Sequence, residues 1–268
     1  MRGIRQIIFV MGIVTPFVIS TGQAVAGGFL SHFAVYDLDL KSTSSSSNVK
    51  AIDGRTSYRL ERSCDGWTAV EDYAISFGVG ESGQISNFIS HYETWESFAG
   101  TAFSFSVVEN SSVTGENIYE GFANINDGMA EAVFLNGEEM NKELPANTVF
   151  PVKHMQELLA LANKGKKVHQ SSLFLGGDEE DAIYFVSSII GNKKSEDPGE
   201  LLGGLGQDSY WPLRIAYFNP EASDAEPDYE IQFDMQENGV IRSYSVDYGD
   251  FVMRAKLNSI EPVTEQNC

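Results

Sequence analysis

The stretch WTAVEDYAISF, residues 67–77, carries apolar side chains at alternate positions over most of its length. Successive side chains of a β-strand point to opposite faces, so a period of two is typical of a strand with one face against a core. This register puts on one side Trp67, Ala69, Tyr73, Ile75 and Phe77. We predict a strand here that packs on one face.

The same alternation continues on both sides of this stretch. SHFAVYDLDL, residues 31–40, places Tyr36, Leu38 and Leu40 on one face, and RTSYRLERS, residues 55–63, turns Tyr58 and Leu60 inward. Similar segments, separated by Gly, Asn, Asp and Ser, follow at 101–109, 117–125, 129–136, 168–176, 182–191, 212–218, 228–236, 240–248 and 251–260. About thirteen strands in a row, with close turn signals, predict an antiparallel meander, sandwich or barrel.

One segment has a different period. FPVKHMQELLALANKGKK, residues 150–167, opens with a proline suited to a first helical turn and ends at Lys164 and Gly165. Its apolar stripe at helical spacing consists of Met155, Leu158, Leu159 and Ala162. We predict one amphipathic helix over 151–164, packed on an open sheet face or plugging a barrel. ISNFISHYETW, residues 85–95, also has helical spacing, but its β-branched residues favour a strand.

The connections differ in length and composition. KSTSSSSNVKAIDG, residues 41–54, and NKKSEDPGELLGGLGQD, residues 192–208, are polar or glycine-rich. We interpret both as mobile connections, with ordered recognition loops as the alternative. Glu237-Asn238-Gly239 predicts a hairpin turn between two strands.

The amino terminus indicates export. Arg2 and Arg5 precede an apolar run over residues 7–20, and Ala24-Val25-Ala26 follows it. The run is shorter than the roughly 20 residues that span a bilayer, and an Ala-x-Ala pattern is typical of signal-peptide cleavage. We predict a signal peptide over 1–26, cleavage after Ala26, and a single exported domain over 27–268 that does not span a membrane. A retained amino-terminal anchor is the alternative.

Charge and cysteine content narrow the possible partners. The chain has 38 acidic and 18 basic side chains, a net charge of −20, which disfavours a nucleic-acid partner. Its two cysteines are Cys64 and Cys268, and exported proteins keep disulfides. A bridge over so long a loop would stabilise the fold by roughly 5 kcal/mol in the chain-entropy model. A free terminal thiol or a disulfide to a second chain stays open.

Motifs for catalysis or cofactor binding receive no support from their context. Gly78-x-Gly80-x-x-Gly83 has the spacing of a dinucleotide-binding loop, but no helix of a βαβ unit follows it, so we interpret it as a hairpin turn. The four histidines, His32, His91, His154 and His169, lack metal-ligand spacing. The acidic runs 138–139 and 178–181 do not match a calcium loop. We therefore predict no catalytic residue, cofactor or metal.

Several stretches taken together resemble the cell-envelope integrity protein B family, periplasmic proteins of Gram-negative bacteria. The resemblance runs from about Leu30 to Cys268. It rests on SHFAVYDLDL, YRLERSCDGW, YETWESFAGTAFSF, FPVKHM, DSYWPLRIAYF and SVDYGDFVMRAKL, in this order. Phe33 stands where the family often has an arginine, so no role of that arginine is transferred, and YRLERS is more polar than its equivalents.

The resemblance implies more than the periodicity does. It implies an all-β fold in which a long antiparallel sheet of about 13–14 strands curls into an open barrel or spiral, with the helix in its interior. It also implies a disulfide between Cys64 and Cys268, which would lock the seam of the sheet if the two ends of the chain pair as neighbours. The implied role is non-enzymatic support of envelope integrity under stress in the periplasm, with a functional connection to periplasmic tetratricopeptide-repeat proteins.

Three functional hypotheses follow. The first is a protein that binds another protein through exposed aromatic residues such as Trp95, Tyr210 and Trp211, although these residues could instead pack in the core. The second is a carrier of lipid or lipoprotein acyl chains, because a curled sheet with a helix at its mouth can enclose an apolar cavity. The third is an envelope hydrolase or calcium-dependent enzyme, which would need a nucleophile and a base converging in one cleft.

Overall fold

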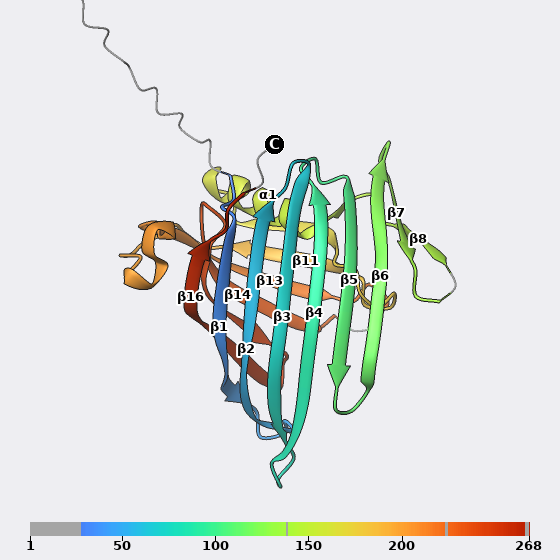
Figure 1. Ribbon diagram of the computed structural model, residues 1–268. Helices are drawn as coiled ribbons and strands as arrows, with labels where there is room; N and C mark the ends of the chain where they lie inside the picture. Colours follow the sequence, from blue (N-terminus) through green and yellow to red (C-terminus); the bar gives the residue numbers. More distant parts are fainter. Residues whose placement is uncertain (1–27, 138, 223–224, 266–267) are drawn as a thin grey trace, which may run out of the picture.

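The computed structural model describes residues 28–137, 139–222, 225–265 and 268 (Figure 1). The predicted signal peptide and its cleavage site lie outside the described residues, as does Glu138 of one acidic run.

One sheet makes up most of the described chain. It contains sixteen strands in the described residues, ordered β8-β7-β6-β5-β4-β3-β2-β1-β16-β15-β14-β13-β11-β10-β9, with β12 paired to β13. Every pairing is antiparallel except that of β9 with β10. The bounds are β1 His32–Thr43, β2 Val49–Arg62, β3 Gly66–Val79, β4 Gln84–Ser97, β5 Ala102–Ser111, β6 Gly115–Asn126, β7 Met129–Phe134, β8 Met140–Leu144, β9 Thr148–Val149, β10 Val168–Phe174, β11 Ile183–Ile190, β12 Lys194–Ser195, β13 Ser209–Phe218, β14 Tyr229–Gln236, β15 Ile241–Asp247 and β16 Phe251–Pro262.

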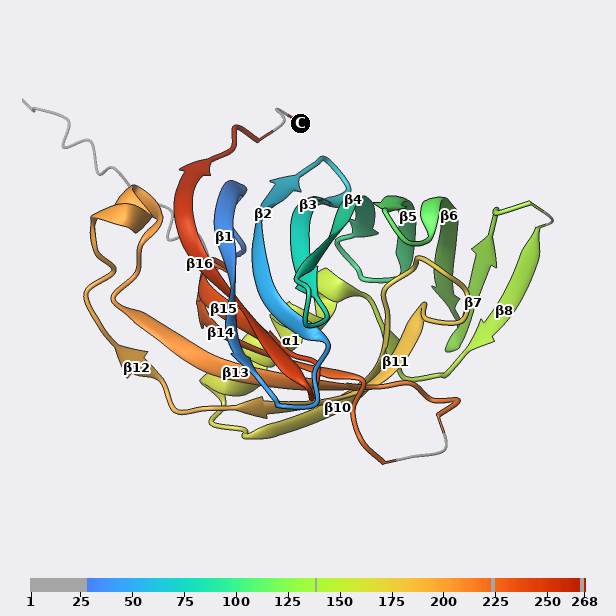
Figure 2. The same ribbon diagram turned by 90° about the horizontal axis from the view of Figure 1, so that it is seen from below.

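The sheet curls into a nearly closed barrel, which confirms the predicted all-β fold with a curled antiparallel sheet. Seen from below, strands β1 to β6 form one wall and β10, β11, β13 and β14 the other, with helix α1 (Pro151–Asn163) between them (Figure 2). We call the enclosed space the lumen. The strand number exceeds the predicted 13–14 because β9 and β12, of two residues each, are too short to produce an alternating pattern.

The alternation predicted for residues 67–77 is present in β3. Trp67 and Ile75 are buried in the inner layer, whereas Asp72 and Ala74 between them are exposed. Two of the three glycines of the dinucleotide-like motif turn the chain from β3 into β4, with φ of 69° at Gly80 and 65° at Gly83, and Gly78 belongs to β3. Residues 85–95 belong to strand β4, which confirms the choice of strand over helix.

Both segments predicted to be irregular connections contain more structure than expected. Most of residues 41–54 belongs to β1 and β2, and only the serine-rich turn over 44–48 lies between them. Residues 192–208 contain β12 and a 3-10 helix, η1 (Glu200–Leu205), whose Leu202 is buried. The prediction was wrong here because a segment's content of serine and glycine does not reveal which strands it will pair with.

Helix α1 confirms the predicted amphipathic segment. Leu158, Leu159 and Ala162 are buried in the core cluster formed with strands β10, β11, β13 and β14, and Met155 packs against it. The helix ends at Asn163, followed by Lys164 at the C-cap and by Gly165 with φ of 72°. Its apolar stripe packs against the wall formed by β10, β11, β13 and β14, so the helix fills one end of the barrel.

A cluster of phenylalanines spans the seam of the sheet, whose path begins at β8 and ends at β9. Phe103 and Phe105 of β5 and Phe134 of β7 meet Phe150, which precedes α1, and Phe174 of β10. The ring centroids lie 5.1 Å apart for Phe103 and Phe150 and 6.0 Å apart for Phe105 and Phe174. Apolar packing therefore joins the two ends of the sheet.

The disulfide Cys64–Cys268 does not lie at the seam of the sheet. It joins the turn between β2 and β3 to the end of the chain beyond β16, with the two Cα atoms 5.6 Å apart. Strand β1 pairs with β16 on one side and β2 on the other, so the bridge spans β1. The expectation that it locks the seam was wrong, because the free ends of the sheet are β8 and β9.

We predict that the double variant C64S/C268S unfolds with a free energy about 2–5 kcal/mol below that of the wild type, because the bridge closes a loop with a sequence separation of 204 residues. Equilibrium urea unfolding measures this difference. A reductant should lower the stability of the wild type but not that of the variant. Equal stability of the oxidised wild type and the variant would contradict a structural role for the bridge.

Candidate functional site

The lumen is filled unequally along its length. At the end that holds α1, Val152 of the helix packs against Leu60 of β2 and Trp67 of β3, and all three side chains are buried. This end is a closed hydrophobic core. Farther from the helix, the inner face of the sheet has fewer partners across the lumen.

A buried carboxylate holds the helix in place. The Val152 and Lys153 N–H groups each donate to one oxygen of Glu96, at 2.8 Å in both cases. The first N–H groups of a helix have no partner within the helix, and Phe150, the residue at the N-cap, offers no side-chain acceptor. Glu96, only 2% exposed, therefore supplies from β4 the cap that the helix lacks.

Burial raises the pKa of Glu96 to about 7, although the two N–H donors and nearby Lys153 act in the opposite direction. The folded protein thus binds a proton at this carboxyl more tightly than the unfolded chain, whose ordinary value is 4.5. Its contribution to stability is complete below the unfolded pKa and is lost as the pH rises through 7. Sequence inspection missed Glu96, because only the strand register shows that it faces inward.

We predict that the difference in unfolding free energy between wild type and E96Q falls by about 3 kcal/mol as the pH rises from 4.5 to 8. Urea unfolding across this range measures it. The stability of the wild type must be compared with that of E96Q because a second group also makes it depend on pH. Burial lowers the pKa of His154 to about 3, so both proteins lose stability as the pH falls below 6.5. I89Q is the control: it changes an exposed residue on the outer face of the same strand and removes no titratable group, so its difference from the wild type should not change with pH.

A second buried polar group joins α1 to the opposite wall. His154 Nε2 lies 3.4 Å from Ser188 Oγ, and the rings of His154 and His169 stack with centroids 5.9 Å apart. His154 Nδ1 has no hydrogen-bond partner, and both His154 and Ser188 are 0% exposed. A serine and a histidine do converge here, but neither is accessible to a substrate and no carboxylate orients the imidazole. We assign this pair to helix packing.

The rest of the lumen lining is apolar and aromatic but incompletely covered. Phe77 pairs with buried Ile52 and Phe88 with buried Ile75, so both point inward, yet each is only half-buried. The same holds for other inner-face residues around this part of the core, including Leu40, Tyr58, Tyr73, Tyr229, Tyr244 and Phe251. Because these inner-face side chains keep accessible apolar surface that a ligand could cover, we take this part of the lumen as the candidate site.

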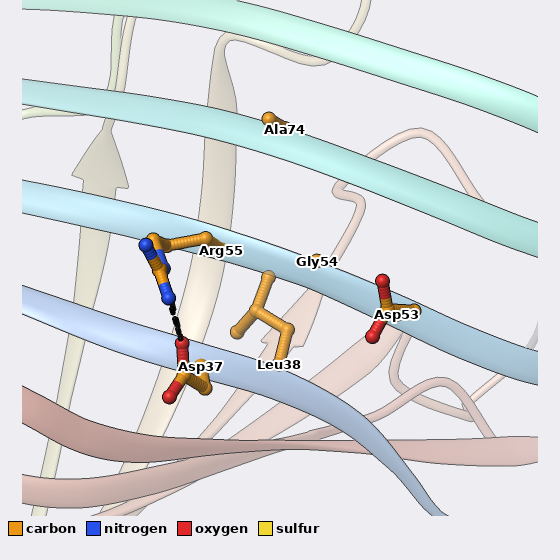
Figure 3. Close-up of a pocket in the computed structure, with 6 residues that line it drawn as sticks. All are labelled: Asp37, Leu38, Asp53, Gly54, Arg55 and Ala74. Carbon is orange, nitrogen blue, oxygen red and sulfur yellow. Dashed lines mark hydrogen bonds and ion pairs between the residues drawn. The ribbon is translucent and has the colours of Figure 1, made fainter.

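Another pocket, of about 350 Å³, lies at strands β1 to β3 and is lined by Asp37, Leu38, Asp53, Gly54, Arg55 and Ala74 (Figure 3). Its main feature is an ion pair between Arg55 and Asp37 at 3.0 Å, drawn as the dashed line, and both side chains are largely exposed. Gly54 permits close strand pairing, because a Cβ there would lie 2.6 Å from the Ala74 carbonyl oxygen. A solvated ion pair in a β-wall gives little specificity.

The residues proposed for partner binding are mostly internal. Tyr210 is 7% and Trp211 3% exposed, so both belong to the core, whereas Trp95 is half-buried. The hypothesis of exposed aromatics was therefore wrong for two of three residues. The acidic run 178–181 forms a turn between β10 and β11.

Two other kinds of feature are absent from the described residues. In the part of the chain that the structure describes, no three or more His, Cys, Asp or Glu side chains are arranged to hold a metal ion. Among the same residues, no helix has the length and apolarity needed to cross a membrane.

Comparison with known proteins gives consistent matches. The profile of the EipB-like family matches residues 23–264. The chain is 30% identical over 249 residues to the cell envelope integrity protein EipB of Brucella abortus (strain 2308), covering 90% of this chain and 87% of the relative. A crystal structure of a β-barrel-like protein of a domain of unknown function from Brucella abortus matches with a TM-score of 0.80 at 28% identity, covering 89% of this chain and 100% of that one.

Proposed function

Because the chain belongs to the EipB-like family, we propose that it supports the integrity of the cell envelope as a periplasmic, non-enzymatic protein that carries an apolar molecule in its lumen. The Brucella relative is named for envelope integrity, which supports the first part of the proposal. The ligand class is the acyl chain of a lipid or lipoprotein.

The lining of the lumen carries the proposal. Protein interiors are close-packed, so aromatic side chains on the inner face of a barrel normally bury almost all of their surface. Phe77, Phe88 and Phe251 of β16 do not. Covering this apolar surface with a ligand would contribute about 25 cal/mol of binding free energy for each Å² buried, before the costs of association are subtracted.

Binding of a protein partner is the second candidate, and it is supported by the hairpin of β7 and β8. Met129 is 72% and Met140 45% exposed there, and β8 is the first strand of the sheet path. An exposed strand edge with apolar side chains can pair with another chain. A tetratricopeptide-repeat protein is the partner class that we propose for this surface. The lumen ranks first because it belongs to the body of the barrel and has a defined lining.

We predict that the uncharged fluorophore N-phenyl-1-naphthylamine binds the wild type with increased fluorescence, and that F88S weakens its binding at least tenfold by removing an aromatic wall of the lumen. Fluorescence titration measures both. The control is I89S, which changes the neighbouring residue on the outer face, where Ile89 is 59% exposed, and should leave the affinity unchanged.

Thermal unfolding by circular dichroism establishes that both variants are folded at the assay temperature. Equal affinities of F88S and I89S would place the fluorophore outside the lumen. Native mass spectrometry of the protein isolated from the periplasm provides a second measurement, in which a bound molecule of lipid mass is expected.

A further inference from the structure

One carboxylate interrupts the apolar lining of the lumen. Glu71 lies on β3 between the inward-facing Ala69 and Tyr73, and its neighbours across the strands are Tyr58 of β2 and Tyr92 of β4. Its side chain accepts a hydrogen bond from the Tyr73 hydroxyl at 2.9 Å. Glu71 therefore faces the lumen rather than solvent outside the barrel.

Tyrosines from several strands surround this carboxylate. The charge of Glu71 contributes to raising the pKa of each, second to burial, so their hydroxyls lie within its electrostatic reach. These residues are Tyr36 of β1, Tyr58 of β2, Tyr73 of β3, Tyr92 of β4, Tyr217 of β13 and Tyr244 of β15. Tyr58, Tyr73, Tyr92 and Tyr244 are half-buried, like Glu71 itself. The carboxylate thus lies in an aromatic enclosure that keeps accessible surface.

Glu71 lacks a positively charged partner. The ion pairs between described residues involve carboxylates such as Asp37, Asp39 and Glu230, and none includes Glu71. Burial raises the pKa of Glu71, while the hydrogen bond from Tyr73 lowers it. Ionising a carboxyl that is partly shielded from water costs free energy, and a bound cation would offset that cost. Tyrosine ring faces also attract cations.

Further carboxylates lie on β5, in the turn between β10 and β11, and just before β14. Glu109 on β5 is half-buried, and its pKa is raised by burial and by the charge of Asp178. Burial raises the pKa of Tyr184, and the charges of Asp181 and Asp228 raise it further. The Tyr184 ring contacts that of Tyr217, with centroids 5.8 Å apart. We call Glu109, Asp178, Asp181 and Asp228 the acidic rim. Such a rim attracts cations and repels phosphate and carboxylate groups.

We propose that the lumen selects molecules in which an ammonium group is attached to an apolar body, with the ammonium group at Glu71 among the tyrosines and the apolar body along Phe77 and Phe88. The proposal rests on the proposed function and specifies its ligand class. The ammonium group could belong to a lipid headgroup or to a free amine. Anionic amphiphiles fit poorly, because Glu71 and the acidic rim would oppose them.

Three probes with the same dodecyl tail test the proposal, each used below its micelle concentration. They are dodecyltrimethylammonium, neutral dodecyl maltoside and dodecyl sulfate, and isothermal titration calorimetry measures their affinities. The wild type should bind the ammonium probe at least tenfold more tightly than the neutral probe. E71Q should lose this preference while still binding the neutral probe. D72N, which removes a charge from the next residue on the outer face, should keep it.

The outcomes separate the two proposals. Binding of the neutral probe without a preference for ammonium, or an equal preference in E71Q and D72N, overturns the ammonium site and leaves the carrier function standing. Failure of all three probes to bind overturns both. Circular dichroism melting of E71Q confirms that the variant is folded.

Lipid vesicles distinguish the two ligand sources. After incubation with vesicles that contain equal amounts of phosphatidylethanolamine and phosphatidylglycerol with the same acyl chains, native mass spectrometry identifies retained lipid. Retention of phosphatidylethanolamine by the wild type and its loss in E71Q assigns the ammonium group to a headgroup. Binding of the dodecyl ammonium probe without lipid retention assigns it to a free amine. Preferential retention of phosphatidylglycerol contradicts the proposal.

Discussion

The hydrogen bonds from the first turn of α1 to Glu96 determine how the lumen is divided. A curled sheet of long strands encloses more space than its own inward side chains fill, and a helix can occupy only the part to which it is anchored. Glu96 anchors the amino terminus of α1 to β4, while Leu158 and Leu159 bury the apolar stripe against the opposite wall. The lumen beyond the helix stays partly uncovered as a consequence.

The barrel is closed by two different kinds of contact in two different places. Phenylalanines from β5, β7 and β10 and from the residue before α1 pack across the seam. The disulfide instead joins the segments that flank β1, where the chain ends already lie in adjacent strands.

The chemistry of the lumen follows from its lining. Its apolar surface suits an acyl chain, and its ionisable groups are carboxylates and tyrosines rather than lysines or arginines around Glu71. An acidic carrier would discriminate by charge as well as by shape, because a cationic ligand offsets the cost of an ionised carboxylate that has no cation beside it.

The sequence by itself determined the all-β class, the strand at 67–77 and the amphipathic helix, because hydrophobic periodicity is a local property of consecutive residues. It did not determine the strand order, the half-open lumen or the roles of Glu71 and Glu96. The alternation in residues 67–77 already puts Glu71 on the apolar face, between Ala69 and Tyr73, but it does not show what Glu71 meets there. Pairing and curling of the sheet bring Glu96 to the N–H groups of α1 and Glu71 to tyrosines from distant strands. Such contacts join residues far apart in the chain, so only the tertiary structure decides them.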